Sequence, residues 1–453
     1  MNEIKEIYNK FSNYIENIKE WKWILISYLV CLLIYISISV QILYQPYIFA
    51  EDGKIFFQEA LNNGISSIFN TYGGYISVIP RIIALIAVSL GKCFNSFYIV
   101  TAVMKFLSIL FAIFCINYFN SNEFKWIIKS RSIRLFFSLI SILILTFQSN
   151  MSYNVTYTHW WAGVFTLLVG LKILDGKMPS IPIILVLVLA ILTSPSALLI
   201  GIPLMYYIIL NIASIIKKKK NDKTYKINRY DIIKIAIIGV AILLQAYAIF
   251  FKSKDIDSIT SPDISINHIF ILMGNIIKCF FTDFTNFLTL GISENLPREI
   301  DILIGITIWG FIFFINIKNK NIKLFAFLTV EMFALIFMSM YKSESLYELP
   351  YFWMNWYNSI PMFCVGLILF KTLYDEYFIC KKIYLRIIII SVCMIYFICF
   401  YINTNKPDYS FCQEVYKIEP YVDFKSTEMK KIPISGGFYP SIPVNMDKYE
   451  NEK

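Results

Sequence analysis

Long apolar runs alternate with shorter polar segments along most of the chain. At 1.5 Å per residue, about 20 apolar residues in a helix cross the ~30 Å hydrocarbon core of a membrane. We therefore predict an all-α bundle of about eleven membrane-spanning helices. They lie near residues 22–43, 97–118, 134–148, 159–174, 181–193, 197–216, 231–251, 301–317, 322–340, 359–374 and 383–402. The run 181–216 is interrupted by the sequence TSPS, so two tilted helices and a re-entrant pair both fit it.

One apolar run is too short to be a span. Val78–Leu90 is shorter than the ~17 residues needed to cross, so we expect a helix lying along the membrane interface. With that choice, every strong Lys/Arg cluster between spans falls on one side, as the positive-inside rule requires. We therefore predict an interfacial helix over residues 1–21, a cytoplasmic N-terminus and an extracytoplasmic C-terminus in a bacterial plasma membrane.

This topology divides the chain into a transmembrane domain, residues 1–402, and a short outer tail, residues 403–453. The polar segments expected on the outer side are long and rich in Trp and Tyr, whereas the inner loops are short and basic. Chemistry or recognition should therefore sit on the outer side. The outer segments are 44–96, 148–161, 252–300, 341–357 and the tail.

Composition supports a membrane protein and excludes several other classes. Hydrophobic residues make up 57% of the 453 residues and charged residues 16%, against roughly 25% charged in globular proteins. This excludes a soluble enzyme, a disordered chain and a nucleic-acid binder. The net charge of +10 arises from lysine clusters in the predicted inner loops. Two histidines and nine cysteines without a CxxC pair predict neither a multi-histidine metal centre nor a disulfide framework.

An acidic pair, Glu51-Asp52, follows the first predicted span. Adjacent carboxylates at a membrane boundary can act as a general base or bind sugar hydroxyls, and Asp52 can equally cap the helix that starts at Gly53. Arg81 opens the short apolar run. It can clamp a phosphate, anchor to lipid headgroups or pair with Glu51 or Asp52.

Five further residues are candidates for substrate binding. Tyr75 follows a Gly-Gly turn, and His159 precedes two tryptophans at the start of a span. Arg298 precedes the span at 301 and can bind a phosphate or anchor the helix end. Lys342 and Trp356 belong to an outer loop that combines charges with aromatic rings. Carbohydrate stacking, an interfacial aromatic belt and a re-entrant helix all fit these residues.

The first outer loop resembles that of the GT-C-fold membrane glycosyltransferases. The resemblance rests on the AEDG sequence around Asp52, the following Phe-Phe helix, the Gly-Gly-Tyr turn and the Pro-Arg segment at Arg81. It implies a sugar donor carried on a polyprenyl phosphate, inverting transfer of a hexose or pentose, and Asp52 beside the reaction centre. The tail is short for this superfamily, although residues 432–443 are expected to form a small β-like element packed on the outer loops.

This resemblance implies a mechanism for the acidic loop. Asp52, supported by Glu51, would deprotonate an acceptor hydroxyl of an envelope glycan, lipid or protein, and Arg81 or Arg298 would hold the lipid phosphate. No cofactor is required, and a divalent ion is compatible with the chemistry. The alternatives are a polysaccharide polymerase or ligase, and a flippase for lipid-linked glycans. A flippase would need polar residues within spans, where Glu331, Lys105 and Gln245 stand out.

Overall fold

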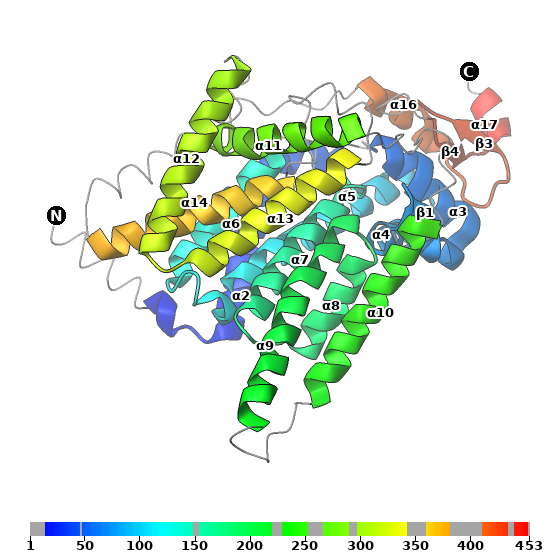
Figure 1. Cartoon of the computed structure of the whole chain (residues 1–453). Helices are drawn as coiled ribbons and strands as arrows, with labels where there is room; N and C mark the ends of the chain where they lie inside the picture. The colour runs from blue at the N-terminus through cyan, green and yellow to red at the C-terminus, as the bar shows by residue number, and fades with distance from the viewer. Residues whose placement is uncertain are drawn as a thin grey trace.

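Helices form nearly all of the described structure. The computed structural model describes residues 14–45, 48–147, 154–219, 229–251, 266–289, 297–341, 359–380, 410–433 and 439–451. The longer helices are α2 (Glu20–Tyr44), α4 (Val78–Phe94), α5 (Phe97–Asn117), α6 (Arg131–Phe147), α7 (Thr158–Leu174), α8 (Ile181–Ile191), α9 (Gly201–Lys219), α10 (Arg229–Phe251), α11 (Ile266–Thr289), α12 (Arg298–Lys318), α13 (Ile322–Tyr341) and α14 (Ser359–Cys380) (Figure 1).

Shorter elements form the first loop, the connections and the tail. The first loop contains the π-helix η1 (Asp52–Phe57), α3 (Gln58–Asn63), the 3₁₀ helix η2 (Gly64–Phe69) and the hairpin of β1 (Thr71–Tyr72) and β2 (Tyr75–Ile76). The connections include η3 (Tyr118–Asn120), η4 (Asn122–Phe124) and η6 (Pro195–Ile200). The tail contains α16 (Ser410–Ile418), η11 (Glu419–Tyr421), the antiparallel strands β3 (Met429–Lys431) and β4 (Ser441–Pro443), and α17 (Met446–Asn451).

The protein is an all-α membrane protein in its main architecture. Five described helices are long and apolar enough to cross a membrane, and two more are apolar but shorter. The five are Glu20–Ser37, Phe97–Asn120, Pro195–Ala213, Arg229–Phe251 and Arg298–Lys318, and the shorter two are Thr158–Leu174 and Ile181–Ile191. The predicted number of about eleven spans stays a prediction, and the expected span 383–402 lies outside the described residues.

Helix α7 is the centre of the bundle. Every residue of α7 except His159 is buried, and the helix packs against α5, α8, α9, η6 and α14. Gly163 allows one of these close approaches, since a Cβ there would lie 2.5 Å from Oγ of Ser196 and 2.3 Å from Cδ1 of Ile360. A helix buried on all sides, with no polar stripe, is the pattern expected at the core of a helical membrane bundle.

Helices α2 and α5 run antiparallel. Nζ of Lys105 donates to the carbonyl oxygen of Gln45, just beyond α2, and Nδ2 of Asn117 donates to that of Ile24 at 3.0 Å. Helix α5 therefore begins at the end of the bundle where α2 finishes. The segment between them, which includes α4, therefore makes no net crossing of the bundle. Helix α4 runs four residues beyond the predicted Val78–Leu90, and its place along the membrane interface stays a prediction.

The two ends of the bundle differ in composition. At one end, Asp52 meets Val155 just before α7, and Gln245 of α10 meets Ile76 of β2. At the other, Nζ of Lys323 reaches the last carbonyl of α7, and the basic positions Lys217–Lys219 finish α9. We call these the Asp52 end and the lysine-rich end. Figure 1 shows α3, α4, β1 and the tail gathered at the Asp52 end.

A second hydrophobic core joins the first loop to the tail. Phe56 and Phe57 of η1 pack with residues of α4 and α5, and with Val422, Ile442 and other tail residues, in one buried cluster. The expected β-like element of the tail is present as the β3–β4 hairpin, with its strands at 429–431 and 441–443. The tail therefore covers the first loop directly.

Two expectations about local structure are wrong. The segment 252–300 was expected to be an outer loop, yet it contains the 24-residue helix α11, which packs on α12, α13 and α14. The helix expected to start at Gly53 begins earlier, because Ala50 and Glu51 are already helical, and its next segment, Asp52–Phe57, is a π-helix. The expected sharp turn at Gly73-Gly74 is confirmed, because both glycines have positive φ, at 60° and 80°, as a tight hairpin turn requires.

Candidate functional site

The carboxylate of Asp52 is held by the turn that precedes α7. Its Oδ2 accepts the backbone N–H of Val155 at 2.8 Å, and its Oδ1 accepts the backbone N–H of Thr156 at 2.7 Å. The hydroxyl of Thr156 also donates to Oδ1. Asp52 is only 4% exposed. The carboxylate thus satisfies N–H groups beside the start of α7, where a negative charge is favourable.

The turn itself explains why these N–H groups are available. The N–H of Tyr157 donates to the carbonyl of Asn154, and that of Thr158 donates to the carbonyl of Val155. The N–H groups of Val155 and Thr156 have no earlier turn to bond with, so they point to Asp52. Asp52 therefore does not cap its own helix. It ties the first loop to the central helix of the bundle.

Burial raises the pKa of Asp52 to about 7 from an ordinary value of 3.8. The three hydrogen bonds act in the opposite direction, and the neighbouring charge of Glu51 adds to the rise. A carboxyl group with this pKa exchanges its proton near neutral pH, which is the condition for general acid–base chemistry.

Glu51 is the less buried residue of the pair, although its Oε2 is itself a buried atom. Its side chain is half-buried, and its Oε2 has no hydrogen-bond partner in the part of the chain that the structure describes. Asp52 is fully engaged with the α7 turn, whereas Glu51 retains acceptor capacity for another group. The two adjacent residues therefore differ in what they can do.

His159 and Tyr75 lie next to this acidic pair. Nδ1 of His159 bonds to the carbonyl oxygen of Thr156, so this nitrogen carries the proton and the neutral ring keeps Nε2 as an acceptor. The ring of Tyr75 lies 6.2 Å from that of His159, measured between centroids. Through Thr156, the structure brings together four predicted site residues, namely Glu51, Asp52, Tyr75 and His159.

Arg81 binds within the first loop. Its guanidinium is 1% exposed and forms an ion pair with Glu59, and its Nη2 donates to the carbonyl of Thr71 at 3.4 Å. Its Cζ lies 5.5 Å from the centre of the Phe56 ring. The acidic partner is Glu59, where Glu51 or Asp52 had been considered. In this arrangement Arg81 fastens α4 to α3 and β1.

Of the remaining predicted residues, the structure describes only Arg298, which does not join the Asp52 cluster. Arg298 is the first residue of α12, and Figure 1 shows α12 well apart from α3 and α4. Lys342 and Trp356 lie outside the described residues. Among the residues that the structure describes, no group of three or more His, Cys, Asp or Glu side chains is arranged to hold a metal ion.

The tail fixes the far end of α4 and the start of α5. Oε1 of Glu419 accepts the hydroxyl of Ser96 at 2.5 Å, and Oε2 accepts the N–H groups of Phe97 and Tyr98 at 3.2 Å each. Glu419 therefore caps α5 from a position more than 300 residues along the chain.

A second pair of contacts joins the tail to the first loop and the α4–α5 turn. Asn95 exchanges hydrogen bonds with the backbone of Val422 and Phe424, and Gln58 of α3 accepts from Ser441. The acidic loop is thus held on one side by the α7 turn and on the other by the tail.

Sequence reasoning missed the residues that hold the site in place. Thr156 and Val155 belong to the segment before the His-Trp-Trp sequence, where polar residues directly ahead of a long apolar helix indicate a helix start. Nothing in the sequence pairs that turn with Asp52, which lies 104 residues away from Thr156. No sequence motif marks Glu59 as the partner of Arg81 or Glu419 as the cap of α5.

A scan against protein-family models, a search of curated proteins and a search of solved structures each found no match to this chain.

Proposed function

We propose that the protein is a membrane glycosyltransferase that takes a sugar from a polyprenyl-phosphate donor at the Asp52 end of the bundle. One observation carries the proposal: Asp52, held by the α7 turn through both carboxylate oxygens, stands next to Glu51, whose buried Oε2 has no hydrogen-bond partner among the described residues. Lipid-linked donors present their phosphate at the membrane interface and their sugar outside it. A loop at the end of an apolar bundle is the place where such a donor and two carboxylates meet.

In the proposed reaction, Glu51 acts as the general base and Asp52 as the positioning residue. Glu51 takes the proton of an acceptor hydroxyl, whose oxygen attacks the anomeric carbon while the bond to the lipid phosphate breaks. Asp52 holds the loop through Thr156. This exchanges the two roles expected from the family resemblance, because both oxygens of Asp52 already accept hydrogen bonds.

The leaving lipid phosphate needs a cation. Arg81 is buried against Glu59, so we assign this part to Lys54, which is exposed on η1 two residues after Asp52. His159 and Tyr75 supply a ring surface and an acceptor nitrogen for sugar hydroxyls. Arg298, Lys342 and Trp356 stay predictions.

The experiment measures donor consumption. Membranes that contain the protein receive a panel of radiolabelled hexosyl and pentosyl polyprenyl phosphates, and the release of polyprenyl phosphate is measured. A transferase consumes at least one donor faster than membranes without the protein. A flippase moves the donor without consuming it. A polymerase or ligase that takes its glycan from a polyprenyl pyrophosphate leaves these monophosphate donors unconsumed. A second panel of pyrophosphate-linked glycans, from which such an enzyme would release polyprenyl pyrophosphate, therefore separates the three activities.

A further inference from the structure

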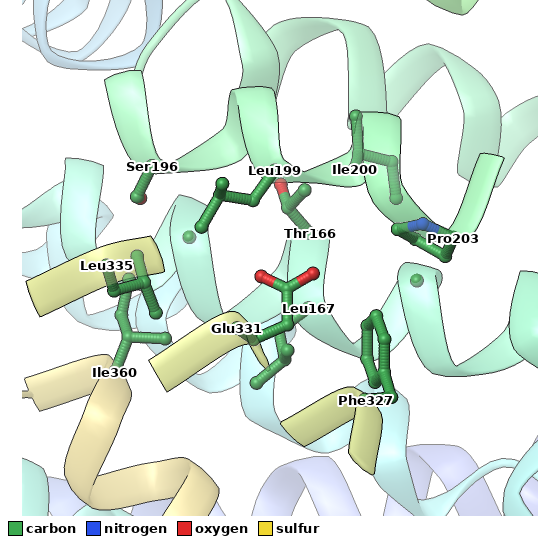
Figure 2. A pocket seen from close by; sticks show the side chains of 12 residues that line it. Thr166, Leu167, Ser196, Leu199, Ile200, Pro203, Phe327, Glu331, Leu335 and Ile360 are labelled. Carbon is green, nitrogen blue, oxygen red and sulfur yellow. The ribbon is translucent and has the colours of Figure 1, made fainter. Parts of the chain in front are cut away.

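A second buried carboxyl group lies inside the bundle, away from the first loop. Glu331 is on α13, ten residues before its end at Tyr341, and is 4% exposed. Its side chain points into a cavity between α7, η6, α9, α13 and α14 (Figure 2). The cavity has a volume of about 10 Å³, the space of roughly one water molecule.

Glu331 is the only ionisable residue among the twelve that line the cavity. Its carboxylate makes no hydrogen bond or ion pair with any residue that the structure describes. A charged carboxylate in apolar surroundings is strongly unfavourable unless a positive charge or a hydrogen-bond donor accompanies it. The group is therefore neutralised either by a proton or by a cation in the cavity.

Two hydroxyl-bearing residues, Thr166 and Ser196, line the same cavity. Oγ1 of Thr166 donates to the carbonyl of Ala162 at 2.8 Å, which leaves its lone pairs free to act as ligands. Oγ of Ser196 shares a hydrogen bond with Ser194 at 2.7 Å and lies against Gly163, where any larger residue would displace it. Figure 2 shows Glu331 pointing toward Thr166 from the opposite wall, with Ser196 to one side.

We propose that this cavity binds one sodium ion. One carboxylate and two hydroxyls are hard oxygen ligands, which suit hard cations. A single carboxylate balances a single positive charge, whereas a divalent ion would leave a net charge in the apolar core. The cavity holds one object the size of a water molecule, and the test below separates sodium from potassium. This site is independent of the transfer reaction proposed for the first loop.

The test is the thermal unfolding of the purified full-length protein in detergent. Sodium chloride, potassium chloride and choline chloride are compared at equal ionic strength. We expect the wild type to gain stability with sodium in a saturable way, because a ligand that binds only the folded state raises its unfolding temperature. Glu331→Gln should lose the sodium response. In Thr166→Val, the sodium concentration that gives half of the maximal stabilisation should rise about tenfold. Glu299→Gln, an exposed control, should keep the sodium response of the wild type.

A direct binding measurement covers the case in which Glu331→Gln does not fold. Radioactive sodium is bound to the wild type and displaced by unlabelled sodium or potassium, and Thr166→Val and Ser196→Ala are compared. The site is supported if unlabelled sodium displaces the radioactive sodium, potassium does not, and both variants bind radioactive sodium more weakly than the wild type. Equal responses to sodium, potassium and choline, or a sodium response that survives in Glu331→Gln, would overturn the proposal and leave Glu331 as a protonated acid.

Discussion

Thr156 gives two hydrogen bonds to one oxygen of Asp52, one from its backbone N–H and one from its hydroxyl. Its carbonyl oxygen meanwhile accepts from His159. One residue thus links the acidic loop to the imidazole at the start of the most buried helix. We therefore expect a substitution in the first loop to change the stability of the α7 turn, and a substitution in the turn to change that of the loop.

The pKa of Asp52 predicts how stability depends on pH. Because the folded-state pKa of about 7 exceeds the ordinary value of 3.8, the folded protein binds the proton more tightly than the unfolded chain. The contribution of Asp52 is therefore fully present below about pH 4 and is lost as the pH rises to about 7, with a slope of at most ~1.4 kcal/mol per unit. Unfolding of the wild type and Asp52→Asn between pH 4 and 8 tests this. A constant difference across that range would contradict it.

The hydroxyl of Thr156 should lower the pKa of Asp52 while stabilising the loop. Thr156→Val keeps the shape and the backbone N–H, and it removes a hydrogen bond worth roughly 1–3 kcal/mol. The pH midpoint assigned to Asp52 should rise. Thr158→Val is the matched control, since its hydroxyl bonds to the carbonyl of Val155 and does not touch Asp52. If Thr156→Val and Thr158→Val give the same pH midpoint, the hydroxyl of Thr156 does not lower the pKa of Asp52.

Arg81 and Glu59 should be energetically coupled. Removing either partner leaves the other without its ion pair, so each single change to Gln should destabilise the protein. A double-mutant cycle on the free energy of unfolding should give a coupling of roughly 1–3 kcal/mol, moderated because Glu59 is 25% exposed. Additive single changes would show that the pair does not fasten α4.

Glu419 should control how firmly the tail sits on the first loop. Glu419→Gln replaces one acceptor oxygen with a donor, so the cap of α5 loses hydrogen bonds worth ~1 kcal/mol. The tail should then be cleaved faster in limited proteolysis of the folded protein. Glu414→Gln is a fair comparison, because Glu414 is on the neighbouring helix and bonds only to Lys417 among the described residues. Equal cleavage of the two variants would refute the capping role.

Hydropathy along the chain predicts the bounds of apolar helices closely, both for the buried α7 and for the mostly exposed α10. The span expected at 159–174 is α7, Thr158–Leu174, and the one expected at 231–251 is α10, Arg229–Phe251. Counting apolar residues missed α11 because its polar residues interrupt the run. Its buried positions Leu272, Ile276, Cys279 and Phe280 still follow helical spacing, so periodicity would have detected it.

The chemical groups of the site were visible in the sequence, but their partners were not. Glu51 and Asp52 stood out as adjacent carboxylates after an apolar run. The turn that holds Asp52, the acid that holds Arg81 and the tail that covers the loop are set by contacts between distant segments. Burial and hydrogen bonding determine which carboxylate is open, and neither follows from residue order.

The central claim is that the acidic pair transfers a sugar, and donor consumption by Glu51→Gln and Asp52→Asn tests it most directly. Release of polyprenyl phosphate from the labelled donors is measured in membranes at matched protein levels. Loss of a general base typically costs ~10²–10⁴-fold in rate, so Glu51→Gln should fall by that factor and Asp52→Asn by less. Glu414→Gln should match the wild type. Wild-type release by Glu51→Gln and Asp52→Asn, or no donor consumed by the wild type, would contradict the account.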